Sequence, residues 1–120
     1  MHTAGNIHEQ HAAQYLQKRG LVVIARNFRC RSGEIDLVCR DAEELVFVEV
    51  RFRSNTRYAS AAESVTLAKQ RKLIRAAQVF LLKYPRYAEL SCRFDVVAMG
   101  PARSKQGEDH VQWLTHAFTA

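Results

Sequence analysis

Two apolar segments of this chain each carry an acidic residue in their middle. Residues 33–38 (GEIDLV) contain Asp36, and residues 45–52 (LVFVEVRF) contain Glu49. A carboxylate that is taken out of water needs a cation, several hydrogen-bond donors or a metal ion to offset its lost hydration. Because both segments are typical of β-strands, the two acids together predict a metal site built on a sheet.

The two segments are expected to form an antiparallel hairpin, since only the polar residues 41–44 separate them. Side chains of a strand alternate between its two faces. This period puts Phe47, Glu49 and Arg51 on one face of the second strand and the valines on the other. Glu49 and Arg51 are therefore predicted to point the same way.

The rest of the chain predicts an α/β fold in one domain, residues 1–120. We expect helices at about 6–19 and 66–84, a strand at 21–24, a basic connection at 27–32, a loop at 53–61 and strands at 34–40, 45–52, 92–99 and 111–118. The order αβββαββ favours one mixed sheet flanked by helices. In the second helix the predicted core stripe is Leu67, Ile74, Ala77 and Leu81.

Composition favours a polyanionic partner. The chain has 18 Lys and Arg against 12 Asp and Glu, a net charge of +6. Thirteen of the cations are Arg, whose planar guanidinium suits phosphate, so nucleic acid is the expected partner. No stretch has the length and apolarity of a transmembrane helix or a signal peptide, so we expect a cytoplasmic protein and no membrane partner. The three cysteines show no CxxC spacing, which argues against a zinc ribbon.

A shared metal ion would solve an electrostatic problem. If neighbouring strands bring Asp36 and Glu49 to about 4 Å, the two charges repel by roughly 4 kcal/mol at an effective dielectric of 20. Carboxylates, a backbone carbonyl and waters are ligands that Mg²⁺ or Mn²⁺ prefers. Such an ion also promotes phosphodiester hydrolysis. Glu9 of the first helix would add a third carboxylate.

Several motifs in order resemble one family. They are GxxxExxAxxYLxxxG from Gly5 to Gly20, NFR at 27–29, GEIDL at 33–37, FVEV at 47–50, Lys69, and RFD at 93–95. This pattern resembles the YraN-like family of predicted endonucleases, which is similar to the Holliday-junction resolvases of the PD-(D/E)xK nuclease superfamily. The resemblance covers about residues 5–118 and implies a restriction-endonuclease-like core.

The resemblance also implies roles for single residues. Asp36 would be the central metal ligand, Glu49 the second carboxylate ligand, and the carbonyl of Val50 a further ligand. Glu9 would assist the metal ion or its waters. The implied cofactor is Mg²⁺ or Mn²⁺, and the implied substrate is DNA, more than RNA, in branched or structured form. A homodimer like that of the resolvases is left open.

Arg51 is where the chain departs from the superfamily pattern, which has a catalytic lysine there. Arginine stays charged and presents a planar fork, so it can stabilise phosphate charge but cannot act as a general base. The resemblance places Lys69, and next to it Gln70, near the scissile phosphate. We therefore expect weakened cleavage with binding retained, unless Lys69 takes over.

Nucleic-acid contacts are expected from cations and one aromatic residue around the predicted site. They are Arg29, Arg31, Arg53, Arg57, Tyr58, Lys69 and Lys72. The same helix cations, with Arg71 and Arg75, could instead form a solvated face. Glu49 and Arg51 could likewise be a simple surface pair worth under about 1 kcal/mol, and Asp36 could pair with an arginine.

Three other polar residues favour plainer interpretations. His8 and His11 lie in HEQH, one residue short of the HExxH zinc spacing, so solvated histidines are expected. Asp95 is expected to pair structurally with Arg93 or Arg29.

Three functions remain open from the sequence. The first is a metal-dependent endonuclease acting on DNA. The second is a catalytically weakened DNA-binding module of the same fold. The third is a basic α/β domain that contacts another protein.

Overall fold

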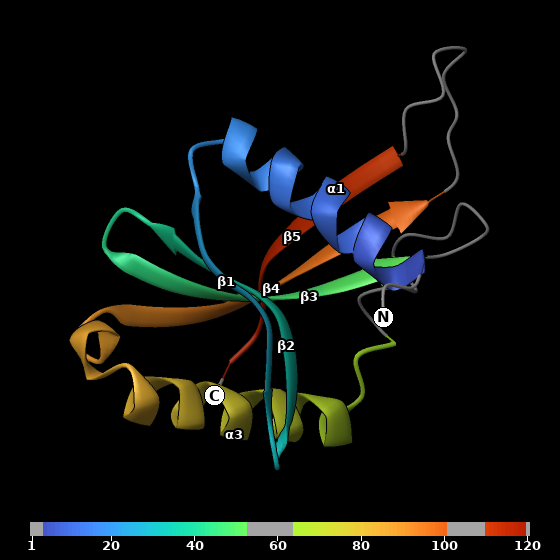
Figure 1. Ribbon diagram of the computed structural model, residues 1–120. Coiled ribbons are helices and arrows are strands. Elements are labelled where there is room, and N and C mark those ends of the chain that lie inside the picture. Colours follow the sequence, from blue (N-terminus) through green and yellow to red (C-terminus); the bar gives the residue numbers. More distant parts are fainter. Residues whose placement is uncertain (1–3, 53–63, 101–109, 120) are drawn as a thin grey trace.

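A five-stranded sheet lies between two helices in the computed structural model, which describes residues 4–52, 64–100 and 110–119. Figure 1 shows α1 on one face of the sheet and α3 on the other. The elements are α1 Ala4–Lys18, β1 Val22–Cys30, β2 Gly33–Asp41, β3 Glu44–Phe52, α3 Leu67–Lys83, the 3₁₀ turn η1 Pro85–Tyr87, β4 Ser91–Gly100 and β5 His110–Phe118. No helix within the described ranges has the length and apolarity needed to cross a membrane.

The sheet is mixed, as the element order predicted. Its strand order is β1-β2-β3-β4-β5, with β3 and β4 parallel and the other neighbours antiparallel. Parallel neighbours need a crossover, and α3 supplies it. The expected α/β class is confirmed, and the arrangement is consistent with a restriction-endonuclease-like core.

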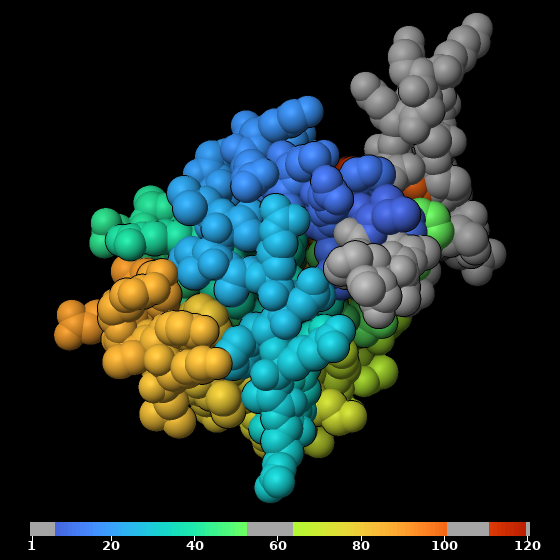
Figure 2. All heavy atoms as spheres, viewed as in Figure 1, coloured from blue at the N-terminus to red at the C-terminus, as the bar shows by residue number. Residues whose placement is uncertain are grey.

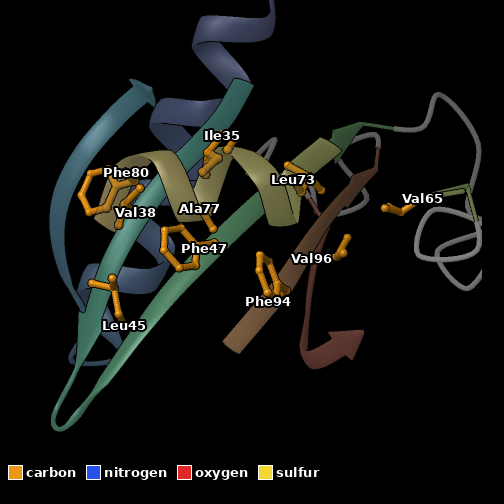
Figure 3. Packing of buried hydrophobic residues seen from close by; sticks show 11 residues of the cluster. Ile35, Val38, Leu45, Phe47, Val65, Leu73, Ala77, Phe80, Phe94 and Val96 are labelled. Atoms are coloured by element: carbon orange, nitrogen blue, oxygen red, sulfur yellow. The ribbon is translucent and has the colours of Figure 1, made fainter. Parts of the chain in front are cut away.

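The larger core lies between the sheet and α3. Phe47 of β3 packs against Phe80 of α3, with ring centroids 5.9 Å apart, and against Phe94 of β4 at 5.5 Å. Figure 3 shows these rings interleaved with the aliphatic side chains of β2 and α3. Burying one such side chain stabilises the fold by roughly 1.5–3 kcal/mol. This packing fixes α3 against the strands that carry the two acids.

The second core lies between the sheet and α1. Ala12, Ala13 and Leu16 of α1 are fully buried, and they pack against Val46 and Val48 of β3. Small side chains allow the helix backbone to approach the sheet closely. Glu9 lies about one helical turn before Ala12 and is therefore held near the sheet.

The first strand is longer than predicted. We expected a strand at 21–24 and a basic connection at 27–32, but β1 runs to Cys30 and pairs with β2 as far as Gly33. Arg26 and Arg29 therefore lie in a strand, and that expectation was wrong. Backbone pairing with β2 outweighs the polar composition, and the irregularities sit at the register shift before Ala25 and at Asn27, whose φ is 53°.

The predicted core stripe of the second helix was also partly wrong. The buried residues of α3 are Leu73, Ala76, Ala77 and Phe80. Leu67 is 67% exposed, whereas Ile74 and Leu81 lie at the border of the core. The buried residues recur at intervals of three and four positions, Phe80 is the bulkiest of them, and the side of the helix that they form meets the sheet.

Asp95 has the structural role that the sequence suggested. It is fully buried and accepts hydrogen bonds from Arg93 Nε (3.2 Å), Trp113 Nε1 (2.9 Å) and the His116 backbone N–H (3.0 Å). Arg93 also donates from Nη1 to Glu44 Oε1 at 2.6 Å. The cluster joins the start of β3, β4 and the edge strand β5.

Candidate active site

The site begins where β2 separates from β3. Their ladder runs from Asp41 and Glu44 to Leu37 and Val48. Just beyond the last pair, the Val50 backbone N–H, two residues after Val48, donates to Asp36 Oδ2 at 2.8 Å. The side chain of Asp36 thus takes the place of the backbone partner that β2 no longer provides. Because the N–H and C=O of one residue in a strand point to the same edge, the Val50 carbonyl is expected to face Asp36 as well.

Glu49 is buried beside Asp36. The Glu49 residue is 6% exposed, and the two carboxyl groups are close enough to share a hydrogen bond. Burial, and then the charge of Asp36, raise the pKa of Glu49 to about 7, against the opposing effects of Lys69 and Arg51. Burial also raises the pKa of Asp36, although the Val50 N–H favours its ionised form. Burial is therefore the main cause of both shifts, and the nearby cations offset it only in part.

Glu9 of α1 interacts with Asp36 from the other face of the sheet. Burial raises the pKa of Glu9 to about 7, with the charge of Asp36 as the next cause, while a hydrogen bond from Asn27 favours the ionised form. Glu9 Oε1 is buried and has no hydrogen-bond partner among the described residues. Asp36 of β2 thus interacts with both other members of the predicted trio, Glu9 of α1 and Glu49 of β3.

Two cations approach Glu49 from the α3 face. Arg51 Nη2 lies 3.1 Å and Lys69 Nζ 3.8 Å from Glu49 Oε2. The predicted common orientation of Glu49 and Arg51 is confirmed. Arg51 Nε is buried and, among the described residues, unpaired, so this guanidinium has a donor left over.

The start of α3 positions Lys69. Thr66 caps the helix by accepting from the Lys69 N–H at 3.2 Å, which sets where the first turn begins. Gln70, which the resemblance places near the scissile phosphate, donates from Nε2 to the Val65 carbonyl at 3.0 Å. This bond gives Gln70 a structural role in the approach to α3.

The donor set fits one hard divalent cation. No group of three or more His, Cys, Asp and Glu side chains is arranged to hold a metal ion within the part of the chain that the structure describes. Asp36 and Glu49 are two carboxylates, and the Val50 carbonyl would be a third oxygen ligand, with waters completing the shell as Mg²⁺ prefers. Burial raises the pKa of both acids, and a cation bound between them would favour their ionised forms, so the residues fit.

The predicted nucleic-acid contacts at the β1–β2 turn lie beside α3. Arg31 and Lys72 are exposed. A Cβ built on Gly33, which follows the turn, would lie 3.4 Å from Lys72 Cβ, so the turn packs against the helix. Figure 2 shows the turn, in cyan, projecting from the body of the molecule. Arg29 is also exposed but pairs with Glu34 at 2.7 Å.

Three predicted contact residues, Arg53, Arg57 and Tyr58, lie outside the described residues, as does the predicted loop at 53–61. The described cations Arg31, Lys69 and Lys72 come from the β1–β2 turn and the first half of α3. These elements border the carboxylates on the α3 side.

Sequence reasoning missed an aromatic pair. His8 stacks on Phe52, with ring centroids 4.1 Å apart and an interplanar angle of 18°. The expectation of a solvated His8 was therefore wrong, because α1 lies over the sheet face that carries Phe52. The alternation that put Glu49 and Arg51 on one face also put Phe52 on the other, and this was the available signal.

The comparisons with known proteins agree with the motifs. The model of "Uncharacterised protein family UPF0102" matches residues 8–99. The UPF0102 protein of Pseudomonas putida GB-1 is 45% identical over 119 residues, covering 96% of this chain and 92% of its own. That of Nitrosococcus oceani is 48% identical over 110 residues, covering 92% and 86%, and that of Nitrosospira multiformis is 46% identical over 114 residues, covering 95% and 91%.

These matches extend over the elements that carry Glu9, Asp36, Glu49 and Lys69. The names of these relatives give only the family designation UPF0102, which assigns no activity. The chain belongs to the uncharacterised protein family UPF0102, the YraN-like family of predicted endonucleases that its sequence motifs resemble.

Proposed function

We propose that this protein is a metal-dependent phosphodiester hydrolase that acts on DNA as an endonuclease. The observation that carries the proposal is the meeting of Asp36 and Glu49 beside Val50, at the point where β2 leaves β3. Two acids with raised pKa values and a nearby backbone oxygen favour a Mg²⁺ or Mn²⁺ ion. Exposed arginine and lysine side chains next to them favour a phosphate backbone.

Each residue has a task in this proposal. Asp36 and Glu49, with the Val50 carbonyl, would hold the ion, which would supply positive charge against the phosphodiester. Glu9 has a pKa of about 7, so at neutral pH it can accept or release a proton of the attacking water. Lys69 stabilises negative charge on the phosphate oxygens while one P–O bond forms to water and another breaks.

Arg51 supports a second candidate, a DNA-binding module that has lost cleavage. Its guanidinium lies 3.1 Å from Glu49 and provides part of the charge that a metal ion would supply. An arginine cannot lose a proton to act as a base. In this alternative the carboxylates hold Arg51 and Lys69 as phosphate contacts, and no metal ion is required.

One experiment distinguishes the hydrolase from the DNA-binding module. Linear, nicked and four-way-junction DNA are incubated with the protein in Mg²⁺ or Mn²⁺, beside Asp36→Asn and Glu49→Gln, which remove charge but keep shape. Glu43→Gln, in the exposed β2–β3 turn, is the matched control. The hydrolase requires metal-dependent cleavage that both site variants lose and the control retains.

Binding of the same DNA without cleavage in either metal would favour the module instead. Cleavage that persists in both site variants would contradict the assignment of the site, because a contaminating nuclease or another part of the chain would then be responsible.

A further inference from the structure

The stacked pair of His8 and Phe52 lies at the end of β3 and has no task in the proposed hydrolysis. The rings are nearly parallel, at 18°, with centroids 4.1 Å apart. Phe52 keeps 37% of its surface exposed. The pair therefore joins α1 to β3 while leaving part of an aromatic surface open to solvent.

The pair is adjacent to the site along both elements. His8 directly precedes Glu9 on α1, and Phe52 directly follows Arg51 on β3. Phe52 lies three positions after Glu49, which in a strand is about 10 Å between their Cα atoms. Because strand side chains alternate, Phe52 faces α1 whereas Glu49 and Arg51 face α3. A base that stacks on Phe52 while its neighbouring phosphate lies at Glu49 would have to pass the end of β3.

Stability alone does not account for the pair. His8 Nδ1 is buried and has no hydrogen-bond partner among the described residues, which is a destabilising arrangement. Phe52 is one of few large apolar side chains exposed on the described surface, and it directly follows Arg51, whose side chain contacts Glu49 on the other face of the sheet. A ligand that is anionic and also has flat faces suits this combination, and nucleic acid is such a ligand.

We propose that the His8–Phe52 pair is a stacking platform for an unpaired base that flanks the phosphate at the acidic site. A base inside a duplex is already stacked on both faces, so only single-stranded, frayed or branched DNA can present a free face. The inference rests on the proposed function and narrows its substrate class to DNA with unstacked bases next to the scissile phosphate.

The test measures affinity in a chelator, so that hydrolysis plays no part. Two probes are used: a fluorescent single-stranded oligonucleotide and a blunt duplex of the same sequence. Phe52→Leu removes the aromatic face but keeps an apolar side chain, and Phe52→Tyr keeps the ring. Leu82→Ala removes an exposed apolar side chain at the far end of α3 and is the matched control.

The platform predicts that Phe52→Leu weakens single-strand binding by roughly 5- to 100-fold, the range of one stacked base. Duplex affinity should change much less, and Phe52→Tyr and Leu82→Ala should bind the single strand like the wild type. An oligonucleotide with 2-aminopurine beside the bound phosphate should show a change in fluorescence that Phe52→Leu abolishes.

Equal losses for single strand and duplex, no loss in Phe52→Leu, or no DNA binding by the wild type would each overturn the platform. Its failure is distinguishable from failure of the hydrolase. A wild type that cleaves DNA but loses nothing in Phe52→Leu rejects the platform alone. A wild type that never cleaves but shows the selective loss rejects the hydrolase and keeps the platform.

Discussion

Glu49 is the residue on which most of the site depends. It is almost fully buried, it shares a hydrogen bond with Asp36, and it holds both Arg51 and Lys69 through Oε2. Its position on the face of Arg51 follows from strand alternation alone. Its partnership with Lys69 does not, because that contact joins residues twenty positions apart and depends on where α3 is capped.

The raised pKa of Glu49 predicts how stability changes with pH in the absence of metal. The unfolded carboxyl loses its proton near pH 4.5, but the folded one keeps it until about pH 7. Between these values the folded state binds more protons, so the free energy of unfolding falls as the pH rises through this window. For Glu49 the loss is on the order of 3 kcal/mol, since each pKa unit corresponds to about 1.36 kcal/mol.

Denaturant unfolding in a chelator at pH 4.5 to 8 measures this effect. Relative to the wild type, Glu49→Gln should gain stability as the pH rises, whereas Glu43→Gln in the exposed turn should show no such trend. A wild type that becomes more stable than Glu49→Gln with rising pH would show that the environment of Glu49 favours its ionised form.

Substitutions can distinguish the role of Arg51 from that of Lys69. In the hydrolase, Arg51→Lys restores a compact ammonium next to Glu49 and should raise kcat by roughly tenfold or more, within the range of a proton-transfer group. Lys69→Ala should lower kcat by roughly 100-fold, as expected for one charge-stabilising donor. Lys18→Ala, in the last turn of α1, is the control.

Initial rates of DNA cleavage in Mn²⁺ check both changes. An Arg51→Lys variant that is no more active than the wild type would reject the idea that arginine weakens this site.

At the scale of elements, the decisive feature is the separation of β2 from β3 at Asp36. The hairpin and its polar turn were predictable from local alternation and composition. The separation was not, because β2 continues to pair with β1 to the end of β1, and this long β1 was itself missed. Polar residues such as Arg26 and Arg29 concealed the strand, although Phe28 between them packs against Phe80 of α3.

Removal of the charge of Asp95 is expected to release β5 first, because Asp95 accepts hydrogen bonds from Trp113 and His116 of that strand. Asp95→Asn leaves the buried Arg93 short of one negative partner and should destabilise the protein by roughly 3–5 kcal/mol. Asp41→Asn removes a half-exposed partner of the same arginine and should cost at most about 1 kcal/mol.

Fluorescence of Trp113, the only tryptophan, follows this change directly. Its Nε1 donates to Asp95, so release of β5 should expose the indole and shift its emission to the red. Equal stability of the two variants would mean that burial of Asp95 has no bearing on the fold.

At the scale of the whole molecule, the chain has a net charge of +6. The β1–β2 turn, the first half of α3 and the end of β3 bring cations around one acidic site. The element order and the motif order predicted this mixed sheet and its family. The facing of α1 and α3 across the sheet, and hence the His8–Phe52 pair, required the tertiary structure.

Salt dependence tests the basic surface. About six phosphate contacts predict a slope of about −5 in a plot of log affinity for duplex DNA against log salt concentration. Lys72→Ala should reduce that slope by about 1, and Lys18→Ala on the opposite helix should leave it unchanged. A nearly flat plot for the wild type would exclude phosphate contacts as the source of affinity.

Calorimetric titration of the wild type with Mn²⁺ at pH 7.5 tests the central claim most directly, with Asp36→Asn and Glu49→Gln as paired variants and Glu43→Gln as control. We propose that Asp36 and Glu49 share one cation. The wild type and Glu43→Gln should therefore bind Mn²⁺ with release of protons, and each site variant should bind at least roughly tenfold more weakly. Undiminished Mn²⁺ affinity in both site variants, or no binding by the wild type, would contradict the shared site.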